Sequence, residues 1–301
     1  MNECEVCGSK NLTSFEAMER MYGLNDIFTY KECENCKGLF LSEIPENLSK
    51  YYPEEYYSFE PYKASSSLVE FIKKVRFEFW KRGINFKPPN YFTWLSNLKV
   101  EQTSKIADIG CGNGQLLAEL SYCGFKNLDG YDPFLTNTGV TKGFTLIKKD
   151  FFEITEKYDL VMFHHSFEHI PNPEKIFNNL STILNPGGEV LIRVPVTDGK
   201  VWQENREFWF QLDAPRHLFI PNTESIICLA DKYSFEVIKI EFDSLESQFW
   251  GTELYRRGKP FVGTDIAKEF SKKEMDIFKT KASQFNKLKI GDQACFYLRK
   301  N

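Results

Sequence analysis

The segment from residue 105 to residue 195 alternates short apolar runs with amphipathic ones, and this alternation constrains the fold more than any other feature. Each apolar run is expected to form a strand: KIADIG, NLDGYDP, FTLIKKDFF, YDLVMFHH and GGEVLIRVP. The runs GQLLAELSYCG and PEKIFNNLSTIL, which lie between them, have the spacing of helices. Strands separated by helical segments predict an α/β fold, with a parallel sheet covered by helices on both faces.

A glycine-rich loop, DIGCGNG at residues 108–114, follows the first predicted strand and precedes a predicted helix. A turn of this kind brings the backbone close to a ligand and directs amide groups at it. The dinucleotide fingerprint G-x-G-x-x-G/A, counted from Gly110, would place Gln115 at the third glycine position, so NAD is disfavoured. No G-K-[ST] follows, which excludes a P-loop.

Ligands of open α/β sheets bind at the carboxyl ends of the strands, near the switch point. This rule places four loops around one site, and they begin near Gly110, Asp132, Asp150 and His164.

Five motifs in this order carry a family resemblance: IADIGCGNGQ, GYDP, KKDFFE, HHSFEHIPNP and LNPGGEV. Over roughly residues 90–242 the chain resembles the class I S-adenosylmethionine-dependent methyltransferases, which implies a Rossmann-like sheet and that cofactor. It is most similar to a subgroup in which a cysteine-paired zinc module precedes the methyltransferase domain. Several members of that subgroup modify sugars or other small metabolites in glycan and natural-product pathways. The segment DAPRHLFIPNTESI, residues 213–226, is also similar to that subgroup.

The resemblance implies where the cofactor is held. Asp108 and the glycines of the loop would line the methionine and ribose part, Asp132 would accept hydrogen bonds from the ribose hydroxyls, and Asp150 would meet the adenine amino group. The full set of expected cofactor-binding residues is Asp108, Gly110, Cys111, Gly112, Asn113, Gly114, Asp132, Pro133, Asp150, Phe151 and His164. For each carboxylate the alternative is a solvated loop residue or a helix cap.

Three of the four histidines fall in HHSFEHIPNP, residues 164–173. The resemblance implies that His164 and His165 lie near the transferring methyl group, and His165 is a candidate catalytic residue. HSFEH also matches the zinc-protease pattern H-x-x-E-H, but that pattern needs a long helix. Here it follows a predicted strand and meets prolines at 171 and 173, so a protease is excluded.

A second divalent metal is an open alternative at this loop. Some methyltransferases bind such an ion with an E-x-x-E-H motif and use it to hold the substrate hydroxyl. This chain matches the motif in part, because His165 replaces the first glutamate, and the candidate ligands are His165, Glu168, His169 and His217. A loop without metal is the favoured interpretation.

His217, in APRHLF, is the candidate general base, because an imidazole with an ordinary pKa near 6.5 accepts a proton at neutral pH. A structural histidine that fixes the loop is the alternative. Arg216 is expected to orient an anionic group of the substrate, such as a sugar phosphate or a carboxylate. Tyr255 is a further candidate for the acceptor pocket.

Two CxxC pairs, CEVCG at residues 4–8 and CENCKG at 33–38, predict a metal site near the N-terminus. Cys4, Cys7, Cys33 and Cys36 complete the four-sulfur shell of a structural zinc ion, which leaves no open position for substrate. The expected module resembles a zinc ribbon. Iron of the rubredoxin kind fits the same spacing, but nothing else in the sequence indicates electron transfer.

The chain is accordingly divided into a zinc module at 1–45, a connector at 46–92, a methyltransferase domain at 93–245 and a C-terminal extension at 246–301. The connector contains the aromatic run YYPEEYYSFEPY, residues 51–62, and a helical stretch. The extension is expected to supply an amphipathic helix near 268–289, an edge strand that completes the sheet, and part of the acceptor pocket.

Composition limits the partners. A net charge of −4 and an isoelectric point near 5.8 provide no basic field for a phosphate backbone, so nucleic acid is disfavoured. No apolar run approaches the ~18–20 residues that span a bilayer, and the N-terminus lacks a secretory pattern. Paired CxxC without an export signal indicates metal rather than disulfides, so we expect a cytoplasmic protein. The oligomeric state is not indicated.

The expected function is methyl transfer from S-adenosylmethionine to a small polar acceptor, sugar-linked or anionic. One alternative is a zinc-bearing RNA base methyltransferase, and another is a non-catalytic protein that keeps the cofactor as a structural part.

Overall fold

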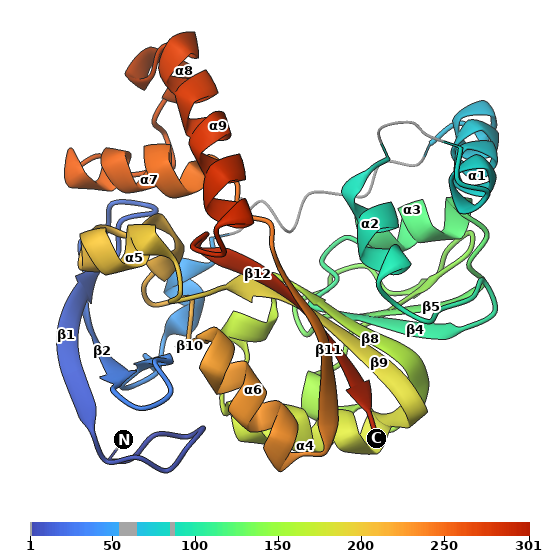
Figure 1. Cartoon of the computed structure of the whole chain (residues 1–301), viewed down its shortest axis with the longest axis horizontal. Coiled ribbons are helices and arrows are strands. Elements are labelled where there is room, and N and C mark those ends of the chain that lie inside the picture. The colour runs from blue at the N-terminus through green and yellow to red at the C-terminus, as the bar shows by residue number, and fades with distance from the viewer. Residues whose placement is uncertain (1, 54–64, 85–87) are drawn as a thin grey trace.

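The computed structural model describes residues 2–53, 65–84 and 88–301. Most of the aromatic run at 51–62 therefore lies outside the described residues. Two sheets organise the described chain, a large mixed sheet and a small antiparallel one near the N-terminus (Figure 1).

The large sheet has eight strands in the order β11-β12-β9-β8-β4-β5-β7-β6. Their bounds are β4 Lys105–Ile109, β5 Asn127–Tyr131, β6 Gly139–Val140, β7 Thr145–Ile147, β8 Tyr158–His164, β9 Leu184–Pro195, β11 Phe235–Phe242 and β12 Gln293–Lys300. The pairs β4–β5, β4–β8, β5–β7 and β8–β9 are parallel, as the alternation predicts. The sheet is mixed rather than purely parallel, because β12 pairs antiparallel with β9 and β11, and β6 pairs antiparallel with β7.

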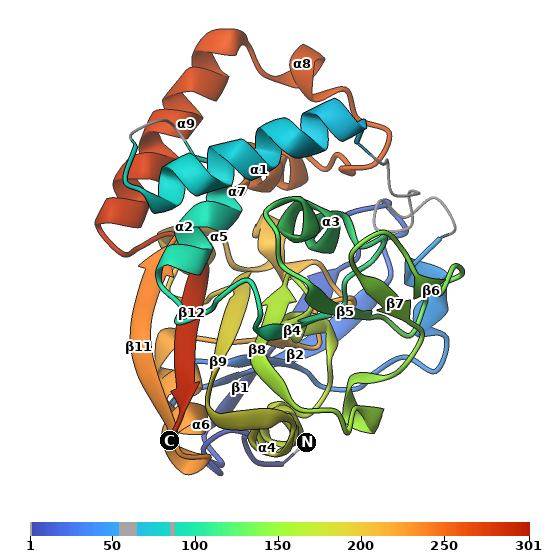
Figure 2. The same cartoon turned by 90° about the vertical axis from the view of Figure 1, so that its right-hand side faces the viewer.

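Helices cover both faces of this sheet (Figure 2). One face carries α1 Ser67–Lys81, α2 Asn90–Ser96 and α3 Gln115–Tyr122; the other carries α4 Pro173–Ile183 and α6 Thr223–Lys232. Strand β8 contributes side chains to both helical layers. Leu160 and Met162 pack in the apolar cluster on the side of α1, α2 and α3, and Val161 and Phe163 pack in the cluster on the side of α4 and α6. A strand buried on both sides is apolar throughout, which is why YDLVMF has no polar alternation.

The C-terminal strand β12 was expected at the edge of the sheet, and that expectation is wrong. It lies between β9 and β11, and its first six residues are buried. The edge position belongs to β11, whose residues are mostly half-buried or exposed. Chain order does not reveal such an insertion, because the pairing of β12 with β9 joins segments about a hundred residues apart.

The small sheet consists of β1 Leu12–Met18, β2 Ile27–Cys33, β3 Leu39–Leu41 and β10 Phe219–Ile220, in that order. All of its pairings are antiparallel. Strand β10 comes from the segment after β9, and Phe219 pairs with Phe40 of β3. The N-terminal segment is therefore joined by backbone hydrogen bonds to the part of the chain that surrounds the large sheet.

The remaining helices are α5 Lys200–Asn205, α7 Ser247–Arg256, α8 Ile266–Glu269 and α9 Lys272–Lys287. Short 3-10 turns occur at η1 Leu48–Tyr51, η3 Phe151–Glu153, η4 Phe167–His169, η5 Arg206–Phe208 and η6 Phe210–Leu212. A third apolar cluster joins α5, α7 and α9 to the small sheet, with Trp202, Trp209 and Phe249 packed near Tyr30 of β2. None of the helices in the described ranges combines the length and the apolar character needed to cross a membrane.

The topology defines where a ligand can bind. From β4 the chain passes to β5 and β7 on one side, and then returns to β8 and β9 on the other. The loops after β4 and β8 therefore diverge, which opens a crevice at their carboxyl ends.

Candidate functional site

A cavity of about 220 Å³ lies in this crevice. Six of the residues expected to act at the site line it: Gly110, Asp132, Pro133, Asp150, Phe151 and His165. They come from the loops after β4, β5, β7 and β8, so strand order has brought together residues 55 positions apart in the sequence.

Gly110 has to be glycine at the floor of this cavity. Its φ is +69°, and a Cβ there would lie 2.4 Å from the Cβ of Ser166. The Ser166 hydroxyl donates to the carbonyl of Ile109 at 2.5 Å, which holds the loop after β8 against the turn after β4. The close approach leaves the cavity open above the backbone.

The rest of the glycine loop lies beside the cavity. Gly112 donates its N–H to Asp132 Oδ2 at 3.2 Å, and Asn113 accepts from the N–H of Gln115. Gly114 precedes α3, and a Cβ there would lie 2.8 Å from the ring of Phe144, so packing against the next loop requires this glycine. Cys111 is half-buried, and burial raises the pKa of its thiol.

Two carboxylates lie at the carboxyl ends of neighbouring strands, Asp108 within β4 and Asp132 directly after β5. Asp132 accepts from Gly112 and, at 2.8 Å, from the N–H of Phe134. Burial raises its pKa, although these two backbone hydrogen bonds oppose the rise. Asp108 is buried with Oδ1 lacking a hydrogen-bond partner, and burial followed by the charge of Asp132 raises its pKa to about 7. These groups fit a cofactor with hydroxyl and ammonium donors, because both retain acceptor capacity beside the glycine turn.

Asp150 and Phe151 form the far wall of the cavity. Asp150 caps the turn η3 and accepts from the N–H of Phe152 at 2.9 Å, so a capping role accounts for part of its presence. Phe151 is buried and packs edge-on against Phe163 of β8. Its position at the cavity wall suits contact with a flat ring.

The structure separates the two adjacent histidines. His164 packs on Trp94, with ring centroids 4.5 Å apart, and is not among the residues that line the cavity. His165 has a left-handed backbone with φ +54° and does line it. Its Nε2 lies 2.6 Å from Arg193 Nη1, and Arg193 is paired at 2.6 Å with Asp243.

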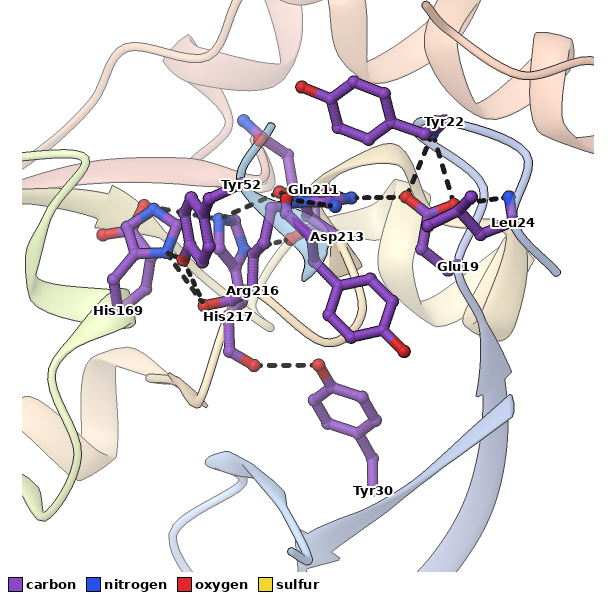
Figure 3. A network of polar contacts seen from close by, with 12 residues as sticks. Glu19, Tyr22, Leu24, Tyr30, Tyr52, His169, Gln211, Asp213, Arg216 and His217 are labelled. Atoms are coloured by element: carbon purple, nitrogen blue, oxygen red, sulfur yellow. Dashed lines mark hydrogen bonds and ion pairs between the residues drawn. The ribbon is translucent and has the colours of Figure 1, made fainter. Parts of the chain in front are cut away.

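The expected base, His217, is buried and does not line the cavity. Its Nδ1 lies 2.8 Å from the carbonyl oxygen of Gln211, while Nε2 lies 3.8 Å from Glu168 Oε1 (Figure 3). Burial, followed by the charge of His169, lowers the pKa of His217 to about 4. So weak a base, without access to the cavity, does not fit the role of proton acceptor from the substrate.

Arg216 and Tyr255 do not fit contact with a substrate either. The Arg216 guanidinium is fully buried and bonded to Asp213, to Glu19 at 2.9 Å and to the carbonyl of Tyr51 (Figure 3). Tyr255 is buried, and its ring packs against Phe210. Arg216 instead ties the N-terminal segment to the loop that carries His217, since Glu19 follows β1.

The four N-terminal cysteines meet, as their spacing predicts. Cys4 and Cys36 have sulfurs 3.5 Å apart, Cys7 and Cys33 have sulfurs 3.6 Å apart, and all four lie within 4.8 Å of one another. A tetrahedron with Zn–S bonds of ~2.3 Å has edges of about 3.8 Å, so the arrangement fits a small zinc-ribbon-like module.

Several cavity residues were missed by the sequence analysis. Tyr52 and Phe134 stack with centroids 6.1 Å apart, and Tyr52 places its hydroxyl 3.1 Å from His169 Nδ1. Lys149 and Ser166 complete the wall. Tyr52 lies among many aromatic residues, so its sequence context did not distinguish it, whereas Lys149 directly precedes the expected Asp150.

Comparison with known proteins agrees with this geometry. The profile of the methyltransferase domain family matches residues 72–240, which is more than half of the chain, so the protein belongs to that family. The chain is 23% identical over 212 residues to a ubiquinone biosynthesis O-methyltransferase of Proteus mirabilis, covering 65% of this chain and 80% of that protein. It is 28% identical over 167 residues to a tRNA U34 carboxymethyltransferase of Campylobacter hominis, covering 47% and 58%.

A ubiquinone biosynthesis O-methyltransferase of Cupriavidus pinatubonensis is 25% identical over 140 residues, 41% of this chain and 56% of that protein. The chain thus spans little more than half the length of two of these relatives. Among solved structures, a SAM-dependent methyltransferase from Archaeoglobus fulgidus matches with a TM-score of 0.46 and 19% identity, covering 78% of this chain and all of that one.

Proposed function

We propose that this chain transfers the methyl group of S-adenosylmethionine to a hydroxyl of a small, sugar-linked acceptor. The observation that carries the proposal is the cavity at the switch point, where Asp132 faces a glycine turn whose floor admits no side chain. Relatives named as O-methyltransferases support oxygen as the accepting atom. The sugar-linked class rests on the resemblance to the subgroup with a cysteine-paired module.

Different residues would bind different parts of the cofactor. Asp132 would hold the ribose hydroxyls with its remaining lone pairs, and Phe151 would pack against the adenine. The bound cofactor supplies a methyl group already activated on sulfur: the C–S bond breaks, its electron pair stays on sulfur, and the acceptor oxygen bonds the methyl and loses its proton. Alignment of the acceptor and removal of that proton are therefore what the protein must add.

The mouth of the cavity suits a small acceptor. Phe134 is 60% exposed and stacks with Tyr52, so the rim offers aromatic surface together with the Lys149 ammonium. Such a rim can bury the apolar side of a sugar ring while the cation meets a phosphate or carboxylate.

RNA methylation is a second candidate, which the tRNA-modifying relative favours and the net charge of −4 opposes. The test is release of S-adenosylhomocysteine from S-adenosylmethionine with three acceptor sets: nucleotide sugars, phenolic quinone precursors and bulk tRNA. We expect release with a nucleotide sugar. If S-adenosylhomocysteine is released only with tRNA, the acceptor is RNA and not a sugar. If the protein binds S-adenosylmethionine but releases no S-adenosylhomocysteine with any acceptor set, the non-catalytic alternative is favoured.

A further inference from the structure

Glu168 is a buried carboxylate that lies beside two histidines without a hydrogen bond to either, with His165 Nδ1 and His217 Nε2 at 3.6 and 3.8 Å from Oε1. Its side chain is fully buried, and neither Oε1 nor Oε2 has a hydrogen-bond partner within the described ranges. A buried charge of this kind is costly unless it is paired, hydrogen-bonded or bound to a metal. Both oxygens of this carboxylate therefore retain the capacity to bind a further group.

Two histidines, His169 and His217, lie next to each other at this carboxylate, with ring centroids 4.8 Å apart (Figure 3). His169 Nδ1 lies 2.8 Å from the carbonyl of Arg216, and His217 Nδ1 lies 2.8 Å from the carbonyl of Gln211. A carbonyl oxygen only accepts, so each Nδ1 carries a hydrogen, and Nε2 is the nitrogen of each ring that could bind a metal. Backbone carbonyls that fix the tautomer in this way are typical of histidines that bind a metal.

We propose that Glu168, His169 and His217 bind a divalent first-row transition-metal ion, and that this ion holds the acceptor hydroxyl. The acceptor part of this inference rests on the proposed function. One ligand atom from each of the three residues lies within 4.8 Å of the others, and His217 Nε2 is 3.8 Å from Glu168 Oε1. Bonds of ~2.1 Å place neighbouring ligand atoms about 3–3.5 Å apart, which small side-chain rotations would achieve.

The ligand set defines the chemistry. Two imidazoles and one carboxylate suit Zn²⁺, Fe²⁺ or Co²⁺, and three protein ligands leave coordination positions open. His169 lines the cavity and lies close enough to Asp132 to influence its pKa, so the open side faces the cofactor region. An acceptor hydroxyl bound there becomes more acidic and gives its proton to water, and its oxygen then takes the methyl group.

His165 is assigned a positioning role instead of a bond to the metal. Because Arg193 only donates, His165 Nε2 must accept, which leaves the hydrogen on Nδ1. That Nδ1 is 3.6 Å from Glu168 Oε1, so it orients the carboxylate electrostatically. His165→Ala should weaken metal binding about tenfold, and His165→Asn, which retains a donor, should restore much of it.

The test is a Co²⁺ titration of the full chain with its cysteine site already loaded with zinc, followed by absorption spectroscopy. We expect one Co²⁺ per chain with d–d bands and no thiolate charge-transfer band. Glu168→Gln and His217→Gln should each weaken this binding by at least tenfold. His164→Gln is the matched control, since His164 lies on Trp94 outside the cluster, and it should bind Co²⁺ like the wild type.

Titration with S-adenosylhomocysteine, performed on every variant, checks folding and separates the two proposals. Variants that bind S-adenosylhomocysteine normally but lose Co²⁺ support the metal site. If the zinc-loaded wild type binds S-adenosylhomocysteine but no Co²⁺ outside the cysteines, the metal inference is overturned and the proposed function stands. Binding of Co²⁺ without S-adenosylhomocysteine would support the site and overturn the proposed function.

Discussion

Asp108 makes the stability of this protein depend on pH in an unusual direction. Its pKa is raised to about 7, mainly by burial, whereas an unfolded aspartate has a value near ~3.9. Between these values the folded chain keeps a proton that the unfolded chain has released. The unfolded state therefore binds fewer protons, and this residue's contribution to stability is present below pH 4 and is lost as the pH rises towards 7.

Asp108→Asn should remove this dependence, because the amide does not titrate. We expect the wild type to become progressively less stable than the variant as pH rises from 5 to 7, by up to about 1.4 kcal/mol per pH unit. Urea unfolding of both proteins at pH 5, 6 and 7 measures the difference in their free energies of unfolding. Groups that titrate in the same way in both proteins do not contribute to this difference. A difference that stays constant over this range would show that Asp108 is ionised throughout.

Gly110→Ala should impair cofactor binding more than it impairs folding. The new methyl group would meet Ser166 Cβ at 2.4 Å, and the left-handed backbone adds a further ~1–2 kcal/mol. We expect S-adenosylhomocysteine affinity to fall more than tenfold, with partial recovery in the Gly110→Ala/Ser166→Gly double variant. Gly187→Ala is the control, because φ there is +71° and the added atom meets nothing within 4 Å. Equal losses in both single variants would mean that strain, rather than the cavity floor, causes the effect.

At the scale of elements, helix α1 is held by one aromatic side chain above all. Phe77 is buried and packs against Phe92 and Trp80 at centroid distances of 5.0 and 5.6 Å. Phe77→Ala should lower the free energy of unfolding by about 3–5 kcal/mol, as expected for a phenylalanine lost from a core. On the same helix Phe71 is 64% exposed, so Phe71→Ala should change stability by less than about 0.5 kcal/mol. Similar losses in denaturant melts of both variants would contradict this packing.

The sequence predicted the elements well where local pattern decides them. Strands β4, β5, β8 and β9 and helices α3 and α4 fall where the alternation of apolar runs placed them. The third strand was overestimated, since β7 covers only Thr145–Ile147 and FFE forms a 3-10 turn after it. The position of β12 was wrong because strand order depends on contacts between distant segments, which periodicity does not encode.

The sequence predicted those site residues that depend on strand order along the chain, but not those that depend on contacts with distant segments. Gly110, Asp132 and Asp150 follow strand ends, and the switch-point rule needs only their order in the chain. Arg216 was assigned to substrate because a charged residue beside a histidine looks exposed in sequence. Its partner Glu19 lies 197 residues away, so burial of the pair could not be foreseen.

At the scale of the whole molecule, the N-terminal segment contacts the loop that carries His217 through a hydrogen bond and a buried ion pair. Tyr30 of β2 donates to the carbonyl of His217 at 2.8 Å, and Glu19 pairs with Arg216 (Figure 3). Strand β3 also pairs with β10. The loop that carries His217 is thus held from the N-terminal side. Breaking a buried ion pair by loss of one partner typically costs about 3–5 kcal/mol.

Loss of the proposed zinc should therefore destabilise the loop that carries His217. In Cys36→Ser we expect faster hydrogen exchange at residues 213–220 as well as in the module, because the pairing partners of that loop lose their anchor. Cys228→Ser is the control, since Cys228 is half-buried and outside the four-sulfur cluster. Faster exchange confined to the module would show that the two parts are independent.

The proposed function requires that the cavity after β4 and β5 binds S-adenosylmethionine through Asp132. Its most direct test is calorimetric titration with S-adenosylhomocysteine of the wild type, of Asp132→Asn and of Asp231→Asn, an exposed aspartate on α6. We expect binding in the wild type and in Asp231→Asn, and a loss of affinity of about tenfold to a hundredfold in Asp132→Asn, as for a charge-assisted hydrogen bond. Absence of binding to the wild type, or equal affinity in all three proteins, would contradict it.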